Sequence, residues 1–273
     1  MSNNSTNGST SLKNRLETQA PESTTPERVT ATEVTHQDVA VTDRQERIAG
    51  FDQSVIDDAS ILVVGAGGIG GEIAEGLVRK GVGELTICDE DIVDASNLNR
   101  QKFHVDDIDA NKATSLVQNL ADHGTTGTTM VGIPQHFQDA IATGTEFDPD
   151  LVICAPDNDA ARVAVADQFH GSVPVVFTGL DSEANGGYVF VQSTEAPCFR
   201  CYRPGANAGG ACPAAPAVVD PTKVVSGIAL YAADTVLMDR YREWDAFEFY
   251  LSGVLPTTAV EVPQRADCPD CGG

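Results

Sequence analysis

Basic residues are scarce in this sequence, and apolar runs of membrane-spanning length are missing. The 273 residues include only 17 lysines and arginines against 40 aspartates and glutamates. Nucleic-acid-binding proteins carry clustered basic residues, so this function class is excluded. No apolar run approaches the roughly 18 residues that a membrane span requires, and the first thirty residues lack the apolar segment of a secretory signal. We therefore expect a cytoplasmic protein.

Aromatic residues are also missing from the N-terminal segment, because none precedes Phe51. Residues 1–43 are rich in Ser, Thr, Asn and Glu instead. Such a segment cannot bury enough apolar surface to offset the conformational entropy that it would lose on ordering. We expect residues 1–43 to be a disordered tail and residues 44–273 to form the folded domain.

The acidic residues are spread along the chain and give a formal net charge of −23. Self-repulsion of this size is tolerated where concentrated salt screens it. Only five of the 17 cations are lysines. The pattern is typical of halophiles, and we expect a protein of a halophilic archaeon.

Short apolar runs rich in β-branched residues alternate with helical stretches from Arg44 onward. This alternation is typical of βαβ units and a parallel sheet. The runs are bounded by Gly, Pro or Asp, and we expect strands buried on both faces. They are Ile61–Gly65, Leu85–Asp89, Leu151–Ala155 and Val173–Thr178.

Two helices and one further strand complete the expected fold. Apolar residues recur at helical spacing between Gly71 and Gly81, and Gly81 is expected to cap that helix. A second helix is expected over Val224–Tyr241. No helix separates the run Gly186–Gln192 from Cys198, so this strand is expected to extend the sheet in an antiparallel direction. The predicted architecture is a doubly wound, Rossmann-like α/β domain with a mixed sheet.

A glycine-rich turn connects the first expected strand to the first expected helix. Glycines in this position let the backbone approach phosphate oxygens at a helix N-terminus, and an acid about 20 residues further on can hold a ribose hydroxyl. Asp89 stands at that distance, at the end of the next strand. The pattern predicts a nucleotide site that includes Gly65, Gly67, Gly68, Gly70 and Asp89.

The segment after Asp89 ends in Arg100, at the sheet edge where doubly wound folds bind ligands. A nicotinamide oxidoreductase has no need of an arginine there. An enzyme that cleaves ATP does, because the cation stabilises charge that develops at phosphorus. The oxidoreductase and a surface Arg100 paired with neighbouring acids remain alternatives.

The motifs together resemble the ThiF/MoeB/HesA family, which is related to the ubiquitin-activating enzymes. The resemblance rests on GAGGIG from Gly65, DEDIVDASNLNRQ from Asp89, Lys112, and DNDAAR from Asp157. It implies an enzyme that uses ATP and Mg²⁺ to adenylate the C-terminal glycine of a small β-grasp protein. That partner would be a ubiquitin-like or sulfur-carrier protein ending in Gly-Gly, and the enzyme would be a homodimer.

The resemblance also implies a role for each matched residue. The four glycines would approach the phosphates and Asp89 would hold the ribose. Asn97 and Arg100 match one family motif, Lys112 would meet the phosphates, and Asp157 would bind magnesium. Asn158 and Arg162 complete the last motif, although a supporting salt bridge is an open alternative for Arg162.

Two Cys-x-x-Cys pairs near the C-terminus predict a metal site. Each pair can place two thiolates on one tetrahedral zinc ion, and disulfides are disfavoured in a reducing cytosol. A redox dithiol is the alternative. Family resemblance implies a structural zinc that ties the C-terminal half together. The ligands would be Cys198, Cys201, Cys268 and Cys271.

Three cysteines remain outside this site. Cys88 and Cys154 lie in or beside expected strands and are expected to be buried. Cys212 lies in the Gly-, Ala- and Pro-rich segment Gly205–Pro216, whose family counterpart crosses over the active site. It is expected either to take up an acyl or persulfide group or to be inert.

The family's N-terminal Arg-Tyr-x-Arg-Gln segment, which reaches the partner subunit's site, is not matched. Only Arg44 and Arg47 could take its place. Separately, a scaffold that binds ATP but has lost catalysis is a third functional alternative.

The acidic composition predicts stability that depends on salt. Thermal unfolding followed at low and at molar KCl should give a higher melting temperature in molar KCl, because salt screens the repulsion among carboxylates. Equal melting temperatures in both buffers would contradict the halophilic interpretation.

Overall fold

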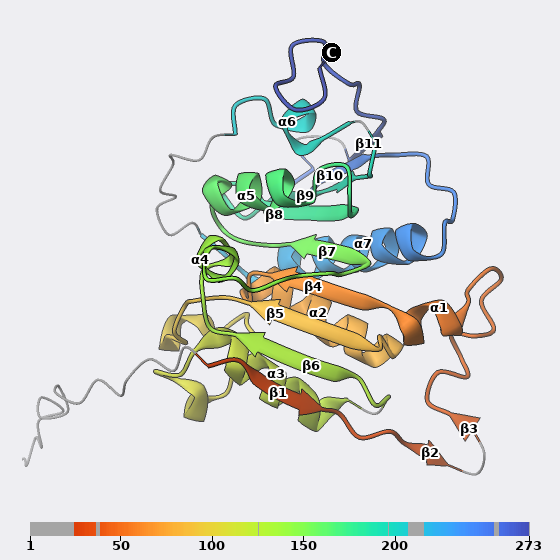
Figure 1. Cartoon of the computed structure of the whole chain (residues 1–273), viewed down its shortest axis with the longest axis vertical. Coiled ribbons are helices and arrows are strands. Elements are labelled where there is room, and N and C mark those ends of the chain that lie inside the picture. Colours follow the sequence, from red (N-terminus) through yellow and green to blue (C-terminus); the bar gives the residue numbers. More distant parts are fainter. Residues whose placement is uncertain are drawn as a thin grey trace, which may run out of the picture.

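The computed structural model describes residues 25–36, 39–124, 126–195, 197–206, 216–253 and 257–272. A nine-stranded sheet runs through the molecule in the order β1-β6-β5-β4-β7-β8-β9-β10-β11 (Figure 1). The parallel strands are β4 (Ser60–Val64), β5 (Glu84–Cys88), β6 (Thr129–Ile133), β7 (Leu151–Cys154) and β8 (Val175–Leu180). This mixed sheet confirms the predicted fold class.

Antiparallel strands extend the sheet at both ends. Beyond β8 lie β9 (Gly186–Gln192), β10 (Ala246–Tyr250) and β11 (Thr258–Val260), which confirms the predicted extension by Gly186–Gln192. At the other end β1 (Glu27–Thr30) pairs with β6. Glu27–Thr30 therefore belongs to the sheet, whereas residues 1–43 were expected to be a disordered tail. A separate two-stranded sheet pairs β2 (Thr35–His36) with β3 (Val39–Ala40).

Helices cover both faces of the sheet (Figure 1). One face packs against α2 (Gly68–Lys80), α3 (Lys112–His123) and α7 (Val219–Leu237). The other packs against α4 (Phe137–Ala142), α5 (Asp159–Phe169) and the short α6 (Phe199–Tyr202). Helix α1 (Gln53–Asp58) precedes β4. Side chains of a strand alternate between the two cores, as Ile61 and Leu62 do, because successive residues point to opposite faces.

Of the two expected helices, one ends at the glycine predicted to cap it, and the other begins and ends at different residues than predicted. Gly81 ends α2 in the left-handed conformation at φ 92°, as predicted. The helix expected over Val224–Tyr241 spans Val219–Leu237 instead. Pro221 lies in its first turn, where the missing N–H costs no intrahelical hydrogen bond, so proline does not delay the start of the helix.

The chain order places a switch point at β4. From β4 the chain proceeds to β5 and β6 on one side, then crosses to β7 and β8 on the other. Ligands of doubly wound sheets bind at the carboxyl ends of the strands at such a point. Among the described residues, no helix has both the length and the apolar character needed to cross a membrane.

The junction between β4 and α2 predicts a contrast between two glycines. A Cβ at Gly70 would lie 1.9 Å from the carbonyl oxygen of Gly65, whereas a Cβ at Gly67 would meet nothing within 4 Å. Gly70→Ala should lower the free energy of unfolding by about 3 kcal/mol, because either the helix or the strand must move. Gly67→Ala should change it by less than about 1 kcal/mol. Guanidinium unfolding followed by circular dichroism measures both, and equal losses would contradict the predicted contrast.

Candidate functional site

The glycine turn joins the end of β4 to the start of α2. Gly65 has φ 98°, a conformation that favours glycine, and a Cβ there would lie 2.7 Å from the carbonyl oxygen of Ala155. Gly67 is the N-cap of α2 and makes no side-chain cap. The first N–H groups of a helix have no intrahelical partner and attract anions. The turn therefore presents an open cradle that fits phosphate oxygens.

Asp89 lies directly after β5 and is buried beside this turn. Its carboxylate accepts hydrogen bonds from the backbone N–H of Ala66 at 2.6 Å and of Asp91 at 2.8 Å. Burial raises the pKa of Asp89 from 3.8 to about 6, while the nearby charge of Lys112 and the Ala66 N–H act in the opposite direction. Because this value lies below 7, most of Asp89 remains ionised at neutral pH and can accept ribose hydroxyls.

Lys112 is the first residue of α3 and is 8% exposed. Its Nζ contacts Asp91 Oδ2 at 2.6 Å. Asn111 caps α3 by accepting from the Thr114 N–H, and its Nδ2 donates to the carbonyl oxygen of Asp89 at 3.0 Å. The lysine is thus held by Asp91, with the charge of Asp89 nearby.

Asp91 and Asn111 are site residues that the sequence analysis did not identify. The Asn-Lys pair before a helical run is an N-cap signal that could have located Asn111. Asp91 is recognisable only from its contact with Lys112.

Arg100 lies beside the N-terminus of α2. A Cβ at Gly68 would lie 3.7 Å from Arg100 Cγ. The guanidinium donates to the carbonyl oxygen of Ser96 and to Asn99 Oδ1, both at 2.9 Å. Within the described residues Arg100 forms no ion pair, unlike the surface pairing considered as an alternative.

Asn97 orients the segment that carries Arg100. Its Oδ1 accepts from the Asp94 N–H at 3.0 Å, and its carbonyl oxygen accepts from the Arg100 N–H at 3.1 Å. The Asn97 side chain is buried. Its observed contacts therefore shape the loop that positions the arginine.

The loop after β7 brings a third group of residues to the same edge. Asp157 is exposed, and Asn158 caps α5 by accepting from the Ala161 N–H at 2.8 Å. Arg162 donates to the carbonyl oxygen of Pro156 at 2.7 Å and pairs with Asp159 at 3.1 Å. The supporting salt bridge considered for Arg162 is thus present. Through its contacts with Pro156 and Asp159, the side chain also stabilises the loop.

The remaining predicted residues are the N-terminal arginines and the cysteines outside the cluster. Cys212 lies outside the described residues. Arg47 pairs with Asp43 at 2.6 Å, whereas Arg44 forms no ion pair with any residue that the structure describes. Cys88 and Cys154 are buried, as expected.

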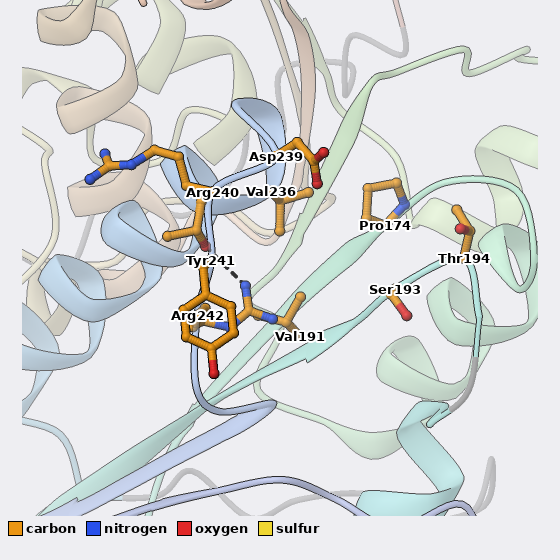
Figure 2. A pocket seen from close by; sticks show the side chains of 10 residues that line it. Pro174, Val191, Ser193, Thr194, Val236, Asp239, Arg240, Tyr241 and Arg242 are labelled. Carbon is orange, nitrogen blue, oxygen red and sulfur yellow. Dashed lines mark hydrogen bonds between the residues drawn. The ribbon is translucent and has the colours of Figure 1, made fainter. Parts of the chain in front are cut away.

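A cavity of about 580 Å³ lies at the opposite edge of the sheet, at the ends of α7 and β9 (Figure 2). It is lined by residues such as Thr235, Tyr241 and Arg242 and by none of the predicted site residues. A cavity of about 360 Å³ includes Arg162 and lies between the start of α5 and the β8–β9 turn. Neither cavity is lined by the glycines of the turn, Arg100 or Lys112.

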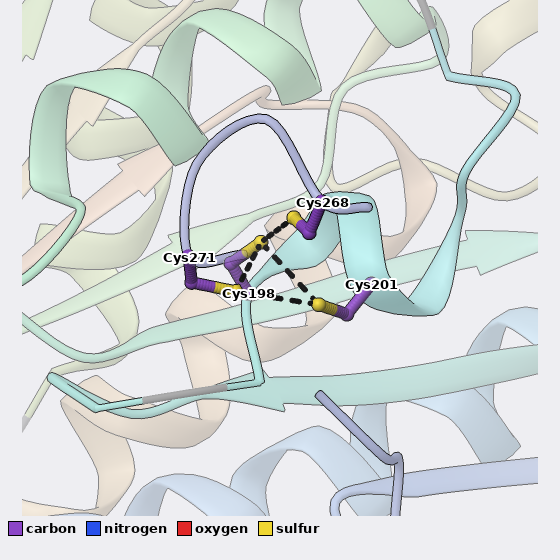
Figure 3. Close-up of side chains that lie close together, drawn as sticks. All are labelled: Cys198, Cys201, Cys268 and Cys271. Atoms are coloured by element: carbon purple, nitrogen blue, oxygen red, sulfur yellow. Dashed lines mark hydrogen bonds between the residues drawn. The ribbon is translucent and has the colours of Figure 1, made fainter. Parts of the chain in front are cut away.

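Four cysteine side chains converge near the C-terminus (Figure 3). Their Sγ atoms all lie within 4.8 Å of one another, with separations of 3.3 Å for Cys198–Cys268 and Cys201–Cys271 and 3.9 Å for Cys198–Cys201. No pair is near the roughly 2.05 Å of a disulfide. Four thiolates bound to zinc at 2.3 Å would lie about 3.8 Å apart. The cluster therefore fits a tetrahedral zinc ion.

The chain is similar to several characterised proteins. The ThiF family profile matches residues 42–260. The SAMP-activating enzyme E1 of Haloferax volcanii is 30% identical over 224 residues, which cover 78% of this chain and 80% of that protein. The molybdopterin-synthase adenylyltransferase of Escherichia coli is 30% identical over 174 residues, covering 62% of this chain and 70% of that protein.

Solved structures support the same relationship at the level of the fold. The crystal structure of E. coli MccB with MccA-N7isoASN has a TM-score of 0.69 at 16% identity and covers 81% of this chain and 69% of that chain. The sequence match spans the glycine turn, the Asp89–Arg100 segment, Lys112, the loop after β7 and the first cysteine pair. The protein belongs to the ThiF family.

Proposed function

We propose that this chain is an ATP-dependent adenylyltransferase that activates the C-terminal glycine of a small ubiquitin-like or sulfur-carrier protein. The observation that carries the proposal is the pair of cations at the glycine cradle. Arg100 lies beside the α2 N-terminus without an ion pair among the described residues, and Lys112 lies near Asp89, whose carboxylate accepts from the Ala66 N–H of the turn. The named relatives are an E1 enzyme and an adenylyltransferase. A nicotinamide oxidoreductase would need neither cation.

The arrangement assigns a role to each group in the reaction. The α2 N-terminus and the glycines Gly65, Gly67, Gly68 and Gly70 would receive the phosphates, and Asp89 would accept the ribose hydroxyls. The partner's carboxylate would attack the α-phosphorus, and pyrophosphate would leave with the electrons of the broken P–O bond. Arg100 and Lys112 would stabilise the negative charge that develops on the phosphate oxygens. Lys112 would then exchange its contact with Asp91 for one with phosphate.

A magnesium ion fits the exposed carboxylate of Asp157, because hard cations prefer oxygen ligands. When bound there it would neutralise phosphate charge. Asn158 and Arg162 hold the loop that presents Asp157.

Further parts of the proposal extend beyond the single chain. We propose a cytoplasmic homodimer that works in concentrated salt. Arg44 is the better candidate to reach the partner subunit's site, because Arg47 is already paired with Asp43. Cys212 is proposed to attack the acyl-adenylate as a thiolate, so that a thioester forms and AMP leaves with the electrons of the broken acyl–oxygen bond. Residues 44–273 would form the enzymatic domain, with β1 joined to its sheet.

Replacing Arg100 tests the proposed reaction. Arg100→Ala should lower partner-dependent ATP–pyrophosphate exchange at least about 100-fold, because the charge that stabilises the transition state is removed. Exchange is measured in molar KCl with small Gly-Gly-ending proteins of the host added one at a time. Arg79→Ala, which removes an exposed cation at the other end of α2, should exchange like the wild type. Wild-type exchange by Arg100→Ala would refute the assignment of Arg100, and ATP binding without exchange for every partner would favour the scaffold.

The cysteine cluster predicts one bound zinc ion per chain. Cys268→Ser should abolish stoichiometric zinc and lower the melting temperature, because binding of a structural zinc adds directly to folding free energy. Elemental analysis after gel filtration measures the metal. Cys154→Ala, which changes a buried cysteine outside the cluster, should keep its zinc. Full zinc content in Cys268→Ser would contradict the proposed ligand set.

A further inference from the structure

Arg200 lies between the cysteine cluster and helix α5. It is the third residue of the first Cys-x-x-Cys pair, and its side chain is 19% exposed. The guanidinium contacts both carboxylate oxygens of Asp167, with NH1–Oδ1 at 2.5 Å and NH2–Oδ2 at 3.0 Å. NH1 also donates to Asp270 Oδ2 at 2.6 Å. One cation thus joins two carboxylates that are 103 positions apart in the chain.

The Asp270 contact bears on how the cluster would hold metal. Asp270 lies between Cys268 and Cys271, and its Oδ2 is 3.6 Å from Cys198 Sγ. A zinc ion with four thiolates carries a net charge of −2, so a carboxylate at this distance would be repelled. Arg200 offsets that repulsion by binding Asp270 directly. Groups that orient and neutralise metal ligands commonly change metal affinity 10- to 100-fold when removed.

The Asp167 contact bears on the nucleotide site. Asp167 lies in the last turn of α5, and the N-cap of the same helix is Asn158, which follows Asp157. Eleven helical residues span about 16 Å, and the helix moves as a rigid unit over this length. The bidentate pair therefore anchors one end of the helix whose other end presents Asp157.

We propose that Arg200 is a positioning residue that locks the zinc-binding cysteines onto α5, so that one side chain sets both metal retention and the placement of Asp157. The link to the nucleotide rests on the proposed function. The link to zinc does not, because it follows from the contacts of Arg200 and the cysteine cluster alone.

Three substitutions separate the two halves of this link. Arg200→Met removes the charge and keeps much of the length. Arg200→Lys keeps the charge but cannot form the two-pronged contact with Asp167. Asp167→Asn weakens only the α5 side, and Asp167 is 53% exposed, so this variant should fold. Arg79→Met, which removes an exposed ion pair with Glu75 on α2, is the matched control.

The first measurement is the rate at which zinc passes from the loaded full-length protein to a colorimetric chelator. Arg200→Met should release zinc at least about tenfold faster than the wild type, and Arg200→Lys should restore most of the retention. Asp167→Asn and Arg79→Met should release zinc at the wild-type rate. A wild-type rate for Arg200→Met, or a wild-type protein that binds no zinc, would overturn the zinc half of the proposal.

The second measurement is hydrogen exchange of the backbone amides of residues 157–163, together with ATP affinity with and without Mg²⁺. Asp167→Asn and Arg200→Met should speed exchange in this segment and weaken Mg²⁺-ATP binding about fivefold. They should leave ATP binding without Mg²⁺ unchanged, since Asp157 is the group displaced. Wild-type exchange in Asp167→Asn would overturn the α5 half.

The two readouts also distinguish this proposal from the proposed function. Zinc release and hydrogen exchange require no adenylation, so they test Arg200 even if no partner protein is activated. A wild-type protein in which Mg²⁺ adds nothing to ATP affinity would count against the role of Asp157 and leave the exchange data to decide on Arg200.

Discussion

The close approach of the Gly65 carbonyl oxygen to Gly70, which leaves no room for a Cβ there, is the constraint on which the site depends. It brings the end of β4 against the first turn of α2 so closely that no side chain fits between them. The first N–H groups of α2, which have no intrahelical partner, follow directly from this turn. The Ala66 N–H, in the same turn, binds Asp89, so the position of the ribose acceptor is fixed by the same approach. The turn proposed to receive phosphate and the carboxylate proposed to accept ribose are therefore parts of one backbone arrangement.

The excess of acidic residues determines which cations at this edge are already bound to a carboxylate and which are available to an anionic ligand. Each of the four described lysines is paired with a carboxylate: Lys80, Lys102, Lys112 and Lys223. In a chain with 40 acidic residues, a cationic side chain readily forms an ion pair with a neighbouring carboxylate. Arg100 forms no ion pair with the described residues, because its guanidinium donates instead to the Ser96 carbonyl oxygen and the Asn99 amide oxygen, which are neutral. An anionic ligand could displace these neutral acceptors at lower electrostatic cost than it could displace a carboxylate.

The fold was predictable where the signal is local, and less so where it arises from distant contacts. The runs that became β4, β5, β7 and β8 are apolar on both faces, and glycines mark the turn that follows β4. Strand β1 has no such signal, because the residues of Glu27–Thr30 alternate between partly buried and exposed positions at an edge of the sheet. The strand is recognisable only through its pairing with β6. The start of α7 at Val219 precedes the predicted start at Val224, and Pro221 lies in the first turn, a position that tolerates proline.

The candidate site shows the same division. The glycines, Asp89 and Arg100 stand in recognisable motifs, and Lys112 is predicted through the family resemblance, so the sequence singles them out as candidates. The roles of Asp91 and Asn111 depend on contacts with Lys112 and Asp89 across the sheet edge, and no spacing rule encodes them. Arg162 could not be assigned from the motif alone, because the same residue can either touch phosphate or brace a loop. Its contacts with Pro156 and Asp159 show the bracing role.

The sheet divides into two parts with different tasks, and α5 is the element that they share. The parallel strands carry the glycine turn proposed to bind the nucleotide, whereas the segments that follow the antiparallel strands β9 and β11 carry the cysteine cluster. Helix α5 starts at the first part and ends at the second, where Arg200 holds Asp167. Phe199, next to that arginine, stacks on Phe177 of β8 with ring centroids 4.3 Å apart. The four-residue helix α6 is too short to be stable by itself. Its position is therefore set by this aromatic contact, by the ion pair of Arg200 with Asp167 of α5, and by the two cluster cysteines at its N-cap and within it, Cys198 and Cys201.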